Sequence, residues 1–160
     1  MTLDYITIDS PVGQLQLVAD QQALIAVLWE CEKLNRVRLG QLAENKNNII
    51  LQNTALQLQE YFNGQRQIFD IPLKFMGTPF QKLVWTALLD IPYGETRTYK
   101  DIAIKIGNIN AVRAVGAANG RNPISIIAPC HRVIGQNGKL VGFAGGLSNK
   151  EILLKIEQNH

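Results

Sequence analysis

The sequence predicts an α+β fold in two lobes: a small antiparallel sheet with one helix over residues 1–77, then a mostly helical lobe over residues 78–160. Three observations predict it. Apolar and polar residues alternate in the first 30 positions, as in half-buried strands. After residue 77, apolar residues recur at steps of three and four, as on the buried side of a helix. Hydrophobic residues make up 46% of the chain and charged residues 18%, a balance that favours a folded core.

The N-terminal lobe begins with strand and turn patterns. Alternation covers residues 3–8 and 14–17, and an apolar run covers residues 24–29. Ser10-Pro11-Val12-Gly13 is a turn sequence, and Asp20 opens a second plausible turn. Short strand-like segments separated by turns predict a small antiparallel sheet.

A helix near residues 50–62 follows these strands. Asn63-Gly64 ends the helix, because glycine readily adopts the left-handed conformation found at helix ends. Residues 65–77 are predicted to be a connector, which places the lobe boundary near residue 77. The apolar stripe of the helix consists of Leu51, Ala55, Leu58 and Phe62.

The second lobe opens with a clear helix start. Thr78 is suited to cap the helix, Pro79 fits its first position, and Gln81 completes a capping box. Ile91-Pro92-Tyr93-Gly94 stops the helix. Its predicted core positions are Phe80, Leu83, Val84, Ala87 and Leu88.

Residues 98–118 predict a helix-turn-helix of winged-helix-like type. Thr98 caps the first helix, with Asp101 at its acidic third position. Gly107 ends that helix, and Asn110 is predicted to cap a second one that continues to about Ala118. Two helices joined by a short turn with glycine form this motif, although many other helical pairs look similar.

The second helix of this pair has two contrasting faces. One face consists mostly of glycine and alanine with a single arginine, which allows another surface to approach closely, including a nucleic-acid groove. Tight packing on a neighbouring helix is an equally good explanation of such a face. The predicted core face is Ala111, Ala114, Val115 and Ala118, and the opposite face is Arg113, Gly116, Ala117 and Gly120.

The strongest chemical pattern surrounds Cys130. Residues 124–127 form an apolar run that predicts a buried strand, and Pro129 forces the residue before it out of helical geometry. Cys130 is therefore expected at the start of a short helical turn, where backbone N–H groups lower a thiol pKa. His131 follows directly, but neighbouring side chains diverge, so it needs a turn or a bridging water to reach the sulfur. A structural cysteine beside a satisfied histidine is the alternative.

The C-terminal helix supplies a partner for His131. Ser148 to Glu151 is a capping-box start, and Ile152, Leu153 and Ile156 are predicted to be buried. Lys150 and Glu157 lie on one stripe of this helix, at steps of three and four residues, so both can project toward one site. An ordinary surface pair is the alternative.

Charge and composition narrow the class of protein. Residues 1–77 carry six basic and eight acidic residues, and residues 78–160 carry ten basic and five acidic residues, so the second lobe is better suited to face a polyanion. The N-terminus has no signal-peptide pattern and no apolar run is long enough to span a bilayer, so a soluble, cytoplasmic protein without membrane contact is expected. The two cysteines and two histidines, including the terminal His160, lack zinc-ligand spacing, so no metal is predicted.

Together, these residues resemble the O-6-alkylguanine-DNA alkyltransferases, also called methylated-DNA–protein-cysteine methyltransferases. The resemblance is specific over residues 78–157, and Phe143 stands where many members have tyrosine. The matching segments, in order, are Ile91-Pro92-Tyr93-Gly94-Glu95-Thr96, Arg113-Ala114-Val115-Gly116, Asn122-Pro123, Pro129-Cys130-His131-Arg132-Val133, Gly142-Phe143-Ala144-Gly145-Gly146-Leu147, and Lys150 to Leu154 with Glu157.

The resemblance implies repair of DNA by irreversible transfer of a methyl or other small alkyl group from O-6 of guanine to an internal cysteine, in one turnover and with base flipping. Thymine alkylated at O-4 is a second candidate substrate. Cys130 is then the nucleophile and acceptor, His131 its base through a water, and Glu157 the group that orients His131. Asn122 holds the cysteine turn by hydrogen bonds.

The resemblance also implies the DNA contacts of a monomer that binds double-stranded DNA from the minor groove without any cofactor. Arg113 fills the base stack, Tyr99 contacts phosphate and flipped base, and Lys150 lies near the leaving guanine. The remaining DNA- and base-binding residues are Gly116, Ala117, Arg121, Val133, Phe143 and Ala144.

Three other functions are possible from the sequence. A non-enzymatic lesion sensor resembles this family but lacks the acceptor cysteine, which is present here as Cys130. A cysteine hydrolase or redox protein needs an oxyanion device or a resolving cysteine, and Cys31 is distant in the sequence. A sequence-reading regulator needs polar base-reading side chains on its recognition helix, and this helix is mostly alanine and glycine.

Overall fold

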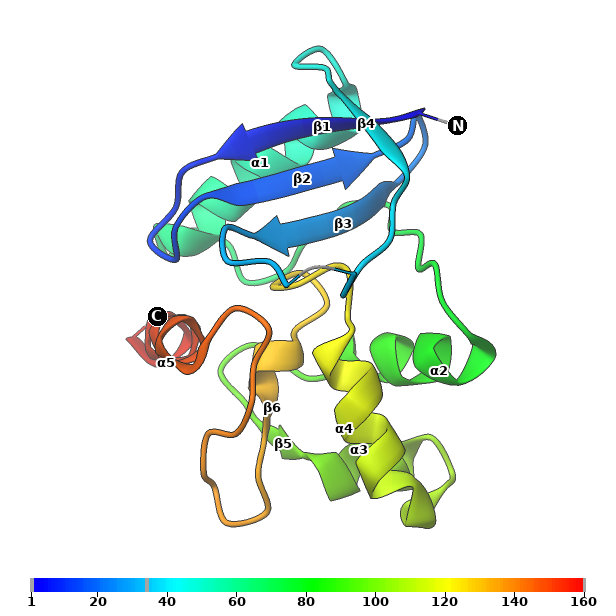
Figure 1. The fold of residues 1–160 in the computed structure, drawn as a ribbon. Helices are drawn as coiled ribbons and strands as arrows, with labels where there is room; N and C mark the ends of the chain where they lie inside the picture. Colours follow the sequence, from blue (N-terminus) through cyan, green and yellow to red (C-terminus); the bar gives the residue numbers. More distant parts are fainter. Residues whose placement is uncertain (1, 34, 160) are drawn as a thin grey trace.

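The computed structural model describes residues 2–33 and 35–159, and its N-terminal lobe is built on a four-stranded sheet in the order β3-β2-β1-β4 (Figure 1). The strands β1 (Thr2–Ile8), β2 (Leu15–Ala19) and β3 (Leu24–Trp29) are antiparallel neighbours, as predicted. The fourth strand, β4 (Gln41–Glu44), pairs with β1 in parallel, so the prediction of a purely antiparallel sheet was incomplete. None of the residues of β4 is buried, so the sequence shows no alternation there.

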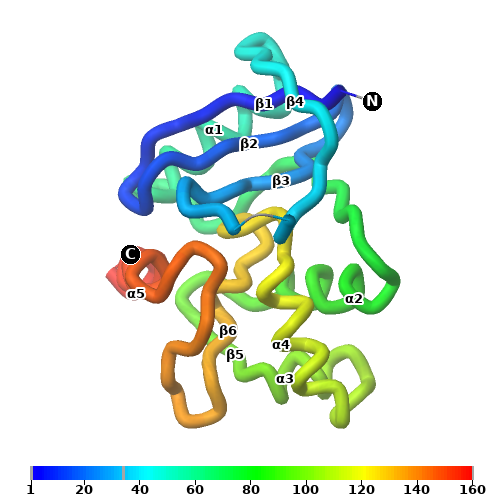
Figure 2. The backbone as a smooth tube through the Cα atoms, in the orientation of Figure 1, coloured from blue at the N-terminus to red at the C-terminus, as the bar shows by residue number. Residues whose placement is uncertain are grey.

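One face of this sheet is covered by α1 (Ile49–Phe62), as Figures 1 and 2 show. Asn48 caps the helix by accepting a hydrogen bond from the Leu51 backbone N–H. The chain between β3 and β4 descends toward the C-terminal lobe before it returns to the sheet (Figure 2). This excursion brings N-terminal residues next to the second lobe.

The C-terminal lobe is mostly helical, and its helix-turn-helix is confirmed. Its helices are α2 (Pro79–Leu88), α3 (Tyr99–Lys105), α4 (Val112–Gly120) and α5 (Leu147–Asn159). The predicted capping box at Thr78 is formed, and the predicted Thr98 cap is part of a second capping box with Asp101. Two short strands, β5 (Arg97–Thr98) and β6 (Val133–Ile134), pair in parallel beside the helices.

Several local predictions in this lobe were wrong, among them Leu83, which was predicted to be a core position of α2 but is 55% exposed. Asn110 does not cap α4, because it lies inside a 3₁₀ turn, η1 (Ile109–Ala111), that tightens the approach to the helix. Ser148 lies within the first turn of α5 rather than before it, since the helix already begins at Leu147 after Gly146. Ala114 is exposed, whereas Val115 and Ala118 are buried as predicted.

Residues 124–127 form a tight turn, not the predicted buried strand. Ile126 has a φ of 73°, and the Ile127 N–H donates to the Ser125 carbonyl at 2.9 Å, which closes a three-residue turn. A positive φ is costly for a β-branched residue and is sustained only by the surrounding packing. The apolar run therefore reflects complete burial of the turn rather than extended pairing.

The two lobes share one hydrophobic core. The Val27 N–H of the edge strand β3 donates to the Pro123 carbonyl at 2.9 Å, so the segment before Cys130 lies along the sheet edge. Leu24 pairs in the same way with the connector, donating to the Pro72 carbonyl at 2.8 Å. Buried residues from both lobes meet in this core, among them Leu17, Leu24, Val27, Trp29, Leu58, Tyr61, Ile124, Ile126 and Leu153.

Within the described residues, the structure contains no helix that is both long and apolar enough to cross a membrane.

Candidate active site

Cys130 opens a short 3₁₀ turn, η2 (Cys130–Arg132), and is only 2% exposed. Asn122 holds the loop that precedes it: Nδ2 donates to the Ala128 carbonyl at 2.8 Å, and Oδ1 accepts from the Ile124 N–H at 3.0 Å. The predicted placement of Cys130 at the start of a helical turn is confirmed. One buried amide therefore fixes the path of the chain on either side of the strained Ile126.

The predicted lowering of the Cys130 pKa was wrong, because burial raises the pKa of this thiol above its ordinary value. The Asn122 and Ser125 side chains and the positive charges of Arg36 and Lys150 act in the opposite direction without overcoming burial. The Cys130 N–H is also engaged, since it donates to the Ala128 carbonyl at 2.8 Å. The resting cysteine is therefore held as a buried thiol.

His131 and Glu157 form a buried pair beside Cys130. Nε2 of His131 lies 2.6 Å from Oε2 of Glu157, and burial lowers the pKa of His131. Burial opposes ionisation of Glu157, but His131 and Arg132 outweigh it and lower the pKa of Glu157 to about 2. An ionised carboxylate only accepts, so Nε2 of the neutral imidazole donates and Nδ1 is left as an acceptor. Nδ1 is buried without a hydrogen-bond partner among the described residues.

Two further side chains hold Glu157, and neither was predicted. Arg132 donates to both carboxylate oxygens, from Nε to Oε1 at 2.8 Å and from Nη2 to Oε2 at 3.1 Å. Tyr61, on α1 of the other lobe, donates its hydroxyl to Oε2 at 2.6 Å. The Gly94 N–H completes the set at 3.5 Å from Oε1. Arg132 lies within the motif that carries the resemblance, but no sequence pattern links Tyr61 to a residue 96 positions away.

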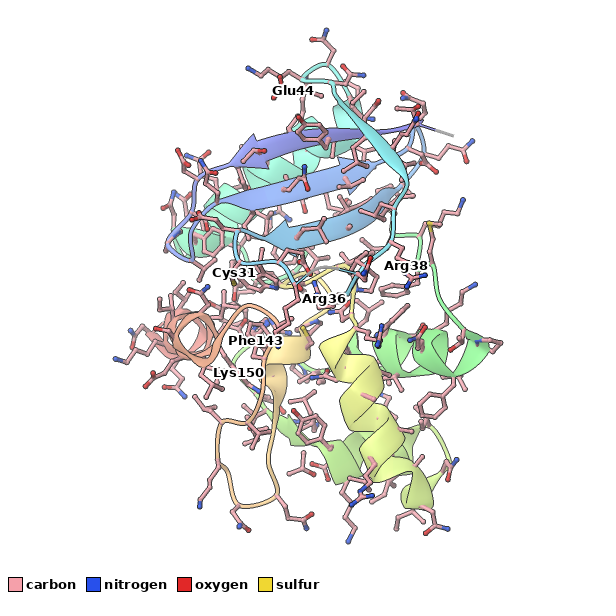
Figure 3. All side chains as sticks on the ribbon, in the orientation of Figure 1. Cys31, Arg36, Arg38, Glu44, Phe143 and Lys150 are labelled. Atoms are coloured by element: carbon pink, nitrogen blue, oxygen red, sulfur yellow. The ribbon has the colours of Figure 1, made fainter. Side chains whose placement is uncertain are left out.

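Lys150 and Phe143 lie together next to the site, where Figure 3 labels both. Lys150 is fully buried, and its Nζ donates to the Val133 carbonyl at 2.6 Å and to the Val141 carbonyl at 3.3 Å. The ammonium also lies 5.7 Å from the centre of the Phe143 ring, which packs edge-on against Trp29. Lys150 and Glu157 are both buried on α5 and both act on the His131 imidazole, as their shared stripe predicted.

A groove of about 900 Å³ runs between the lobes and collects many of the predicted DNA- and base-binding residues. Tyr99 is half-buried in its wall, and burial raises its pKa. Arg113 and Ala117 are exposed on α4 and do not line the groove. The predicted residues that line it are Tyr99, Gly116, Arg121, Phe143 and Ala144.

The other wall of the groove comes from the loop after β3, which sequence reasoning did not assign to the site. From this loop, Arg36 donates to the Asn122 carbonyl at 2.9 Å and to the Gly120 carbonyl at 3.2 Å (Figure 3). Glu32 holds the Arg36 guanidinium from the preceding turn of the chain. Cys31 was predicted to be a small buried residue, but it is exposed.

A chain of contacts also connects β3 to the cysteine. The Trp29 indole N–H donates to Ser125 Oγ at 3.0 Å, and Ser125 faces Cys130.

Across residues 2–33 and 35–159, no three His, Cys, Asp or Glu side chains form a group that could hold a metal ion. His160 lies outside the described residues.

Comparison with known proteins gives matches over both lobes. Residues 3–75 match a family described as 6-O-methylguanine DNA methyltransferase, ribonuclease-like domain, and residues 79–159 match 6-O-methylguanine DNA methyltransferase, DNA binding domain. The methylated-DNA–protein-cysteine methyltransferase of Methanosarcina barkeri is 49% identical over 156 residues, with 98% of each chain covered. The protein of the same name from Mycolicibacterium paratuberculosis is 45% identical over 158 residues, covering 99% of this chain and 94% of that one. The crystal structure of Mycobacterium tuberculosis OGT in complex with DNA matches with a TM-score of 0.88 at 43% identity, covering 99% and 94% of the two chains.

Proposed function

The chain belongs to the 6-O-methylguanine DNA methyltransferase family, whose reaction is direct repair of DNA by alkyl transfer to a cysteine, and we propose that Cys130 is the acceptor in this chain. The observation that carries this proposal is the buried His131–Glu157 pair beside Cys130. That pair leaves Nδ1 of the imidazole as a buried acceptor without a hydrogen-bond partner among the described residues, on the residue that directly follows the buried Cys130. His131 held in this way is suited to act as the base that removes the proton of the Cys130 thiol.

The proton of Cys130 leaves through a bridging water to Nδ1 of His131. Glu157 stays ionised and holds Nε2–H, so it fixes the tautomer and stabilises the imidazolium that forms. Asn122 keeps the thiolate in place through the loop hydrogen bonds. Because burial raises the thiol pKa, this transfer is unfavourable in the free protein and is completed only when the alkylated base is in place.

In the chemical step, the Cys130 sulfur attacks the alkyl carbon in line with the bond to O-6 of guanine. The S–C bond forms, the C–O bond breaks, and guanine takes the electron pair. Tyr99 stays protonated because its pKa is raised, so its hydroxyl can donate to the departing base. The lesion itself supplies the alkyl group, so the step balances without a methyl donor. The thioether product is stable to water, and Cys130 is used once.

The substrate is a guanine flipped out of double-stranded DNA. A carbon on O-6 is blocked inside the duplex, and Cys130 lies too deep to reach a stacked base. In this proposal, the protein binds as a monomer from the minor groove through α3 and α4, with Gly116 and Ala117 allowing close approach. Arg113 enters the stack in place of the base, and Arg121 holds phosphate.

The flipped base lies in the groove against the loop after β6. Ala144 and the ring of Phe143 line its pocket, whereas Val133 is buried outside the groove and its carbonyl accepts from Lys150. Lys150 stabilises this pocket through its bonds to the loop carbonyls rather than from an exposed position. Residues 78–160 thus form the DNA-binding and transfer unit, and residues 1–77 support it.

Intact-protein mass after mixing with a duplex that carries one methylated guanine tests this proposal. We expect a stoichiometric gain of one methyl group that maps to Cys130. Cys130→Ala should gain nothing while its affinity for the duplex stays within about twofold. Tight binding of the lesion without any mass change would indicate a sensor instead, and the absence of both binding and mass change would contradict the proposal as a whole.

A further inference from the structure

Tyr61 brings the N-terminal lobe into direct contact with the buried pair. Its side chain is fully buried on α1, and its hydroxyl donates to the Oε2 atom of Glu157 at 2.6 Å. The same oxygen contacts Nε2 of His131, also at 2.6 Å. Two short hydrogen bonds from two lobes therefore converge on one carboxylate oxygen.

We propose that Tyr61 is a positioning residue for alkyl transfer: its hydroxyl fixes the Glu157 carboxylate against His131 and limits how strongly that carboxylate attracts the imidazole proton. This inference rests on the proposed function, because it assigns Tyr61 a role in the same proton path. It also gives the N-terminal lobe a specific part in the chemistry.

The hydroxyl of Tyr61 is a constant donor. Burial and the adjacent Glu157 charge raise the pKa of Tyr61 far above its ordinary value, so the phenol does not ionise in the working range. It therefore cannot accept a proton from Glu157 or His131, and its contribution is to orient the Glu157 carboxylate. The carboxylate beside it has its pKa lowered to about 2, so it remains an acceptor throughout the same range.

When several donors share one carboxylate oxygen, that oxygen is a weaker acceptor for each of them. On Oε2, the Tyr61 hydroxyl and one Arg132 N–H accompany the His131 bond. Loss of the hydroxyl would leave more negative charge for the imidazole, which favours imidazolium and raises the pKa of His131. A base that is protonated at higher pH is blocked over a wider acidic range, so the acid limb of the transfer rate should move upward.

The other groups that face the pair do not change when this hydroxyl is removed. Arg132 on η2 and Lys150 on α5 disfavour the charged imidazole, and Cys130 acts on Lys150. Tyr93, in the segment between α2 and β5, faces Glu157 with its ring 6.2 Å from that of Tyr61. A phenylalanine at residue 61 keeps the ring packing and removes only the hydroxyl.

Tyr93 provides a matched control. Its hydroxyl donates to the Ile156 backbone carbonyl at 3.3 Å and not to the carboxylate. Tyr93→Phe therefore removes a hydroxyl from the same aromatic cluster without touching Glu157. A general effect of deleting a tyrosine hydroxyl should appear in both variants, whereas positioning of the carboxylate is specific to Tyr61→Phe.

The experiment compares single-turnover methyl transfer by wild type, Tyr61→Phe and Tyr93→Phe from pH 5 to 8 at saturating methylated duplex. Imidazole resonances report the His131 titration, with His160 as the only other histidine in the chain. For Tyr61→Phe we expect the acid limb and the His131 midpoint to rise together by about 0.5 to 1 pH unit. The maximal rate should fall at least threefold, and duplex affinity should stay within twofold. Tyr93→Phe should match wild type.

Two results would overturn the inference. One is an acid limb and a His131 midpoint that do not move in Tyr61→Phe, whatever its maximal rate, since a slower rate alone indicates only looser packing. The other is an equal shift in Tyr93→Phe. Failure of the proposed function gives a different result, because wild type itself then gains no methyl group at Cys130.

Discussion

Replacing Glu157 with glutamine removes one negative charge from a buried polar cluster. The Glu157 side chain is 1% exposed and that of Arg132 is 7% exposed. Arg132 donates hydrogen bonds to both oxygens of the Glu157 carboxylate. Glutamine has nearly the same shape, so packing is retained. The guanidinium of Arg132 then keeps its neutral partner, the Ile91 carbonyl at 2.7 Å, but loses its counter-ion.

Two estimates of the loss in stability agree. Leaving a buried ion without its partner costs about 3–5 kcal/mol. Independently, a fall in the Glu157 pKa from 4.5 to about 2 on folding corresponds to about 3 kcal/mol at neutral pH. Glu157→Gln should therefore lower the free energy of unfolding at pH 7 by about 3 kcal/mol or more, or the melting temperature by about 6–12 °C.

The sign of the pH dependence gives a second test. Because the folded pKa of Glu157 lies below its unfolded value of 4.5, its stabilisation is complete above pH 4.5 and is lost as the pH falls toward 2. In wild type, about 1–2 kcal/mol of this contribution to the free energy of unfolding should be lost between pH 7 and pH 3.5. Glu157→Gln lacks this carboxyl group, so its free energy of unfolding should fall by that much less over the same interval. Other carboxyl groups titrate equally in both proteins and cancel.

Urea unfolding at the two pH values measures both quantities. Glu151→Gln is the control, since Glu151 lies on the same helix and is exposed. It should change stability by less than about 0.5 kcal/mol. A loss below about 1 kcal/mol in Glu157→Gln, or equal losses in the two variants, would refute the reasoning that this cluster is an electrostatically satisfied buried network.

Two further predictions concern the groove and its loop. Arg113→Ala should slow repair of a methylated duplex at least tenfold but transfer from a free alkylated guanine less than twofold, because only the duplex needs the stack refilled; equal slowing in the two rate assays would argue against that role. Gly145→Ala should lower stability by about 1–3 kcal/mol in thermal unfolding, because its Cβ would lie 2.6 Å from the Trp29 ring. Gly142→Ala meets nothing within 4 Å and should be neutral, so matching losses would exclude this clash as the cause.

Local sequence chemistry predicted the C-terminal lobe well because its helices carry their own start signals. The capping box at Thr78 and the cap at Thr98 formed as predicted, and the stripe on α5 placed Lys150 and Glu157 inward. Each of these patterns depends on residues within about seven positions of one another. The caps are short-range hydrogen bonds between side chains and nearby backbone, so tertiary contacts had little to override there.

The failures occur where distant parts of the chain decide the outcome. Residues 124–127 look like a strand because they are apolar, yet the sheet edge and Asn122 bend them into a turn. The thiol pKa of Cys130 was misjudged because Cys130 is buried in the packed core of the C-terminal lobe, and this burial raises the pKa. Arg36 and Tyr61 reach the site from positions 86 and 96 residues away from their partners, Asn122 and Glu157, which no periodicity encodes.

In the proposed function Cys130 is used once, and these long-range contacts then explain why it is buried as a thiol. Exposed thiolates are the forms most easily oxidised, and oxidation of Cys130 would waste the whole molecule before any repair. Burial keeps the sulfur protonated, while the positive charges of Arg36 and Lys150 reduce the cost of forming thiolate when a base arrives. Arg36 comes from the N-terminal lobe and Lys150 from α5, so both lobes are needed for this balance. The N-terminal lobe therefore helps to set the reactivity of Cys130 even though it supplies no reacting atom.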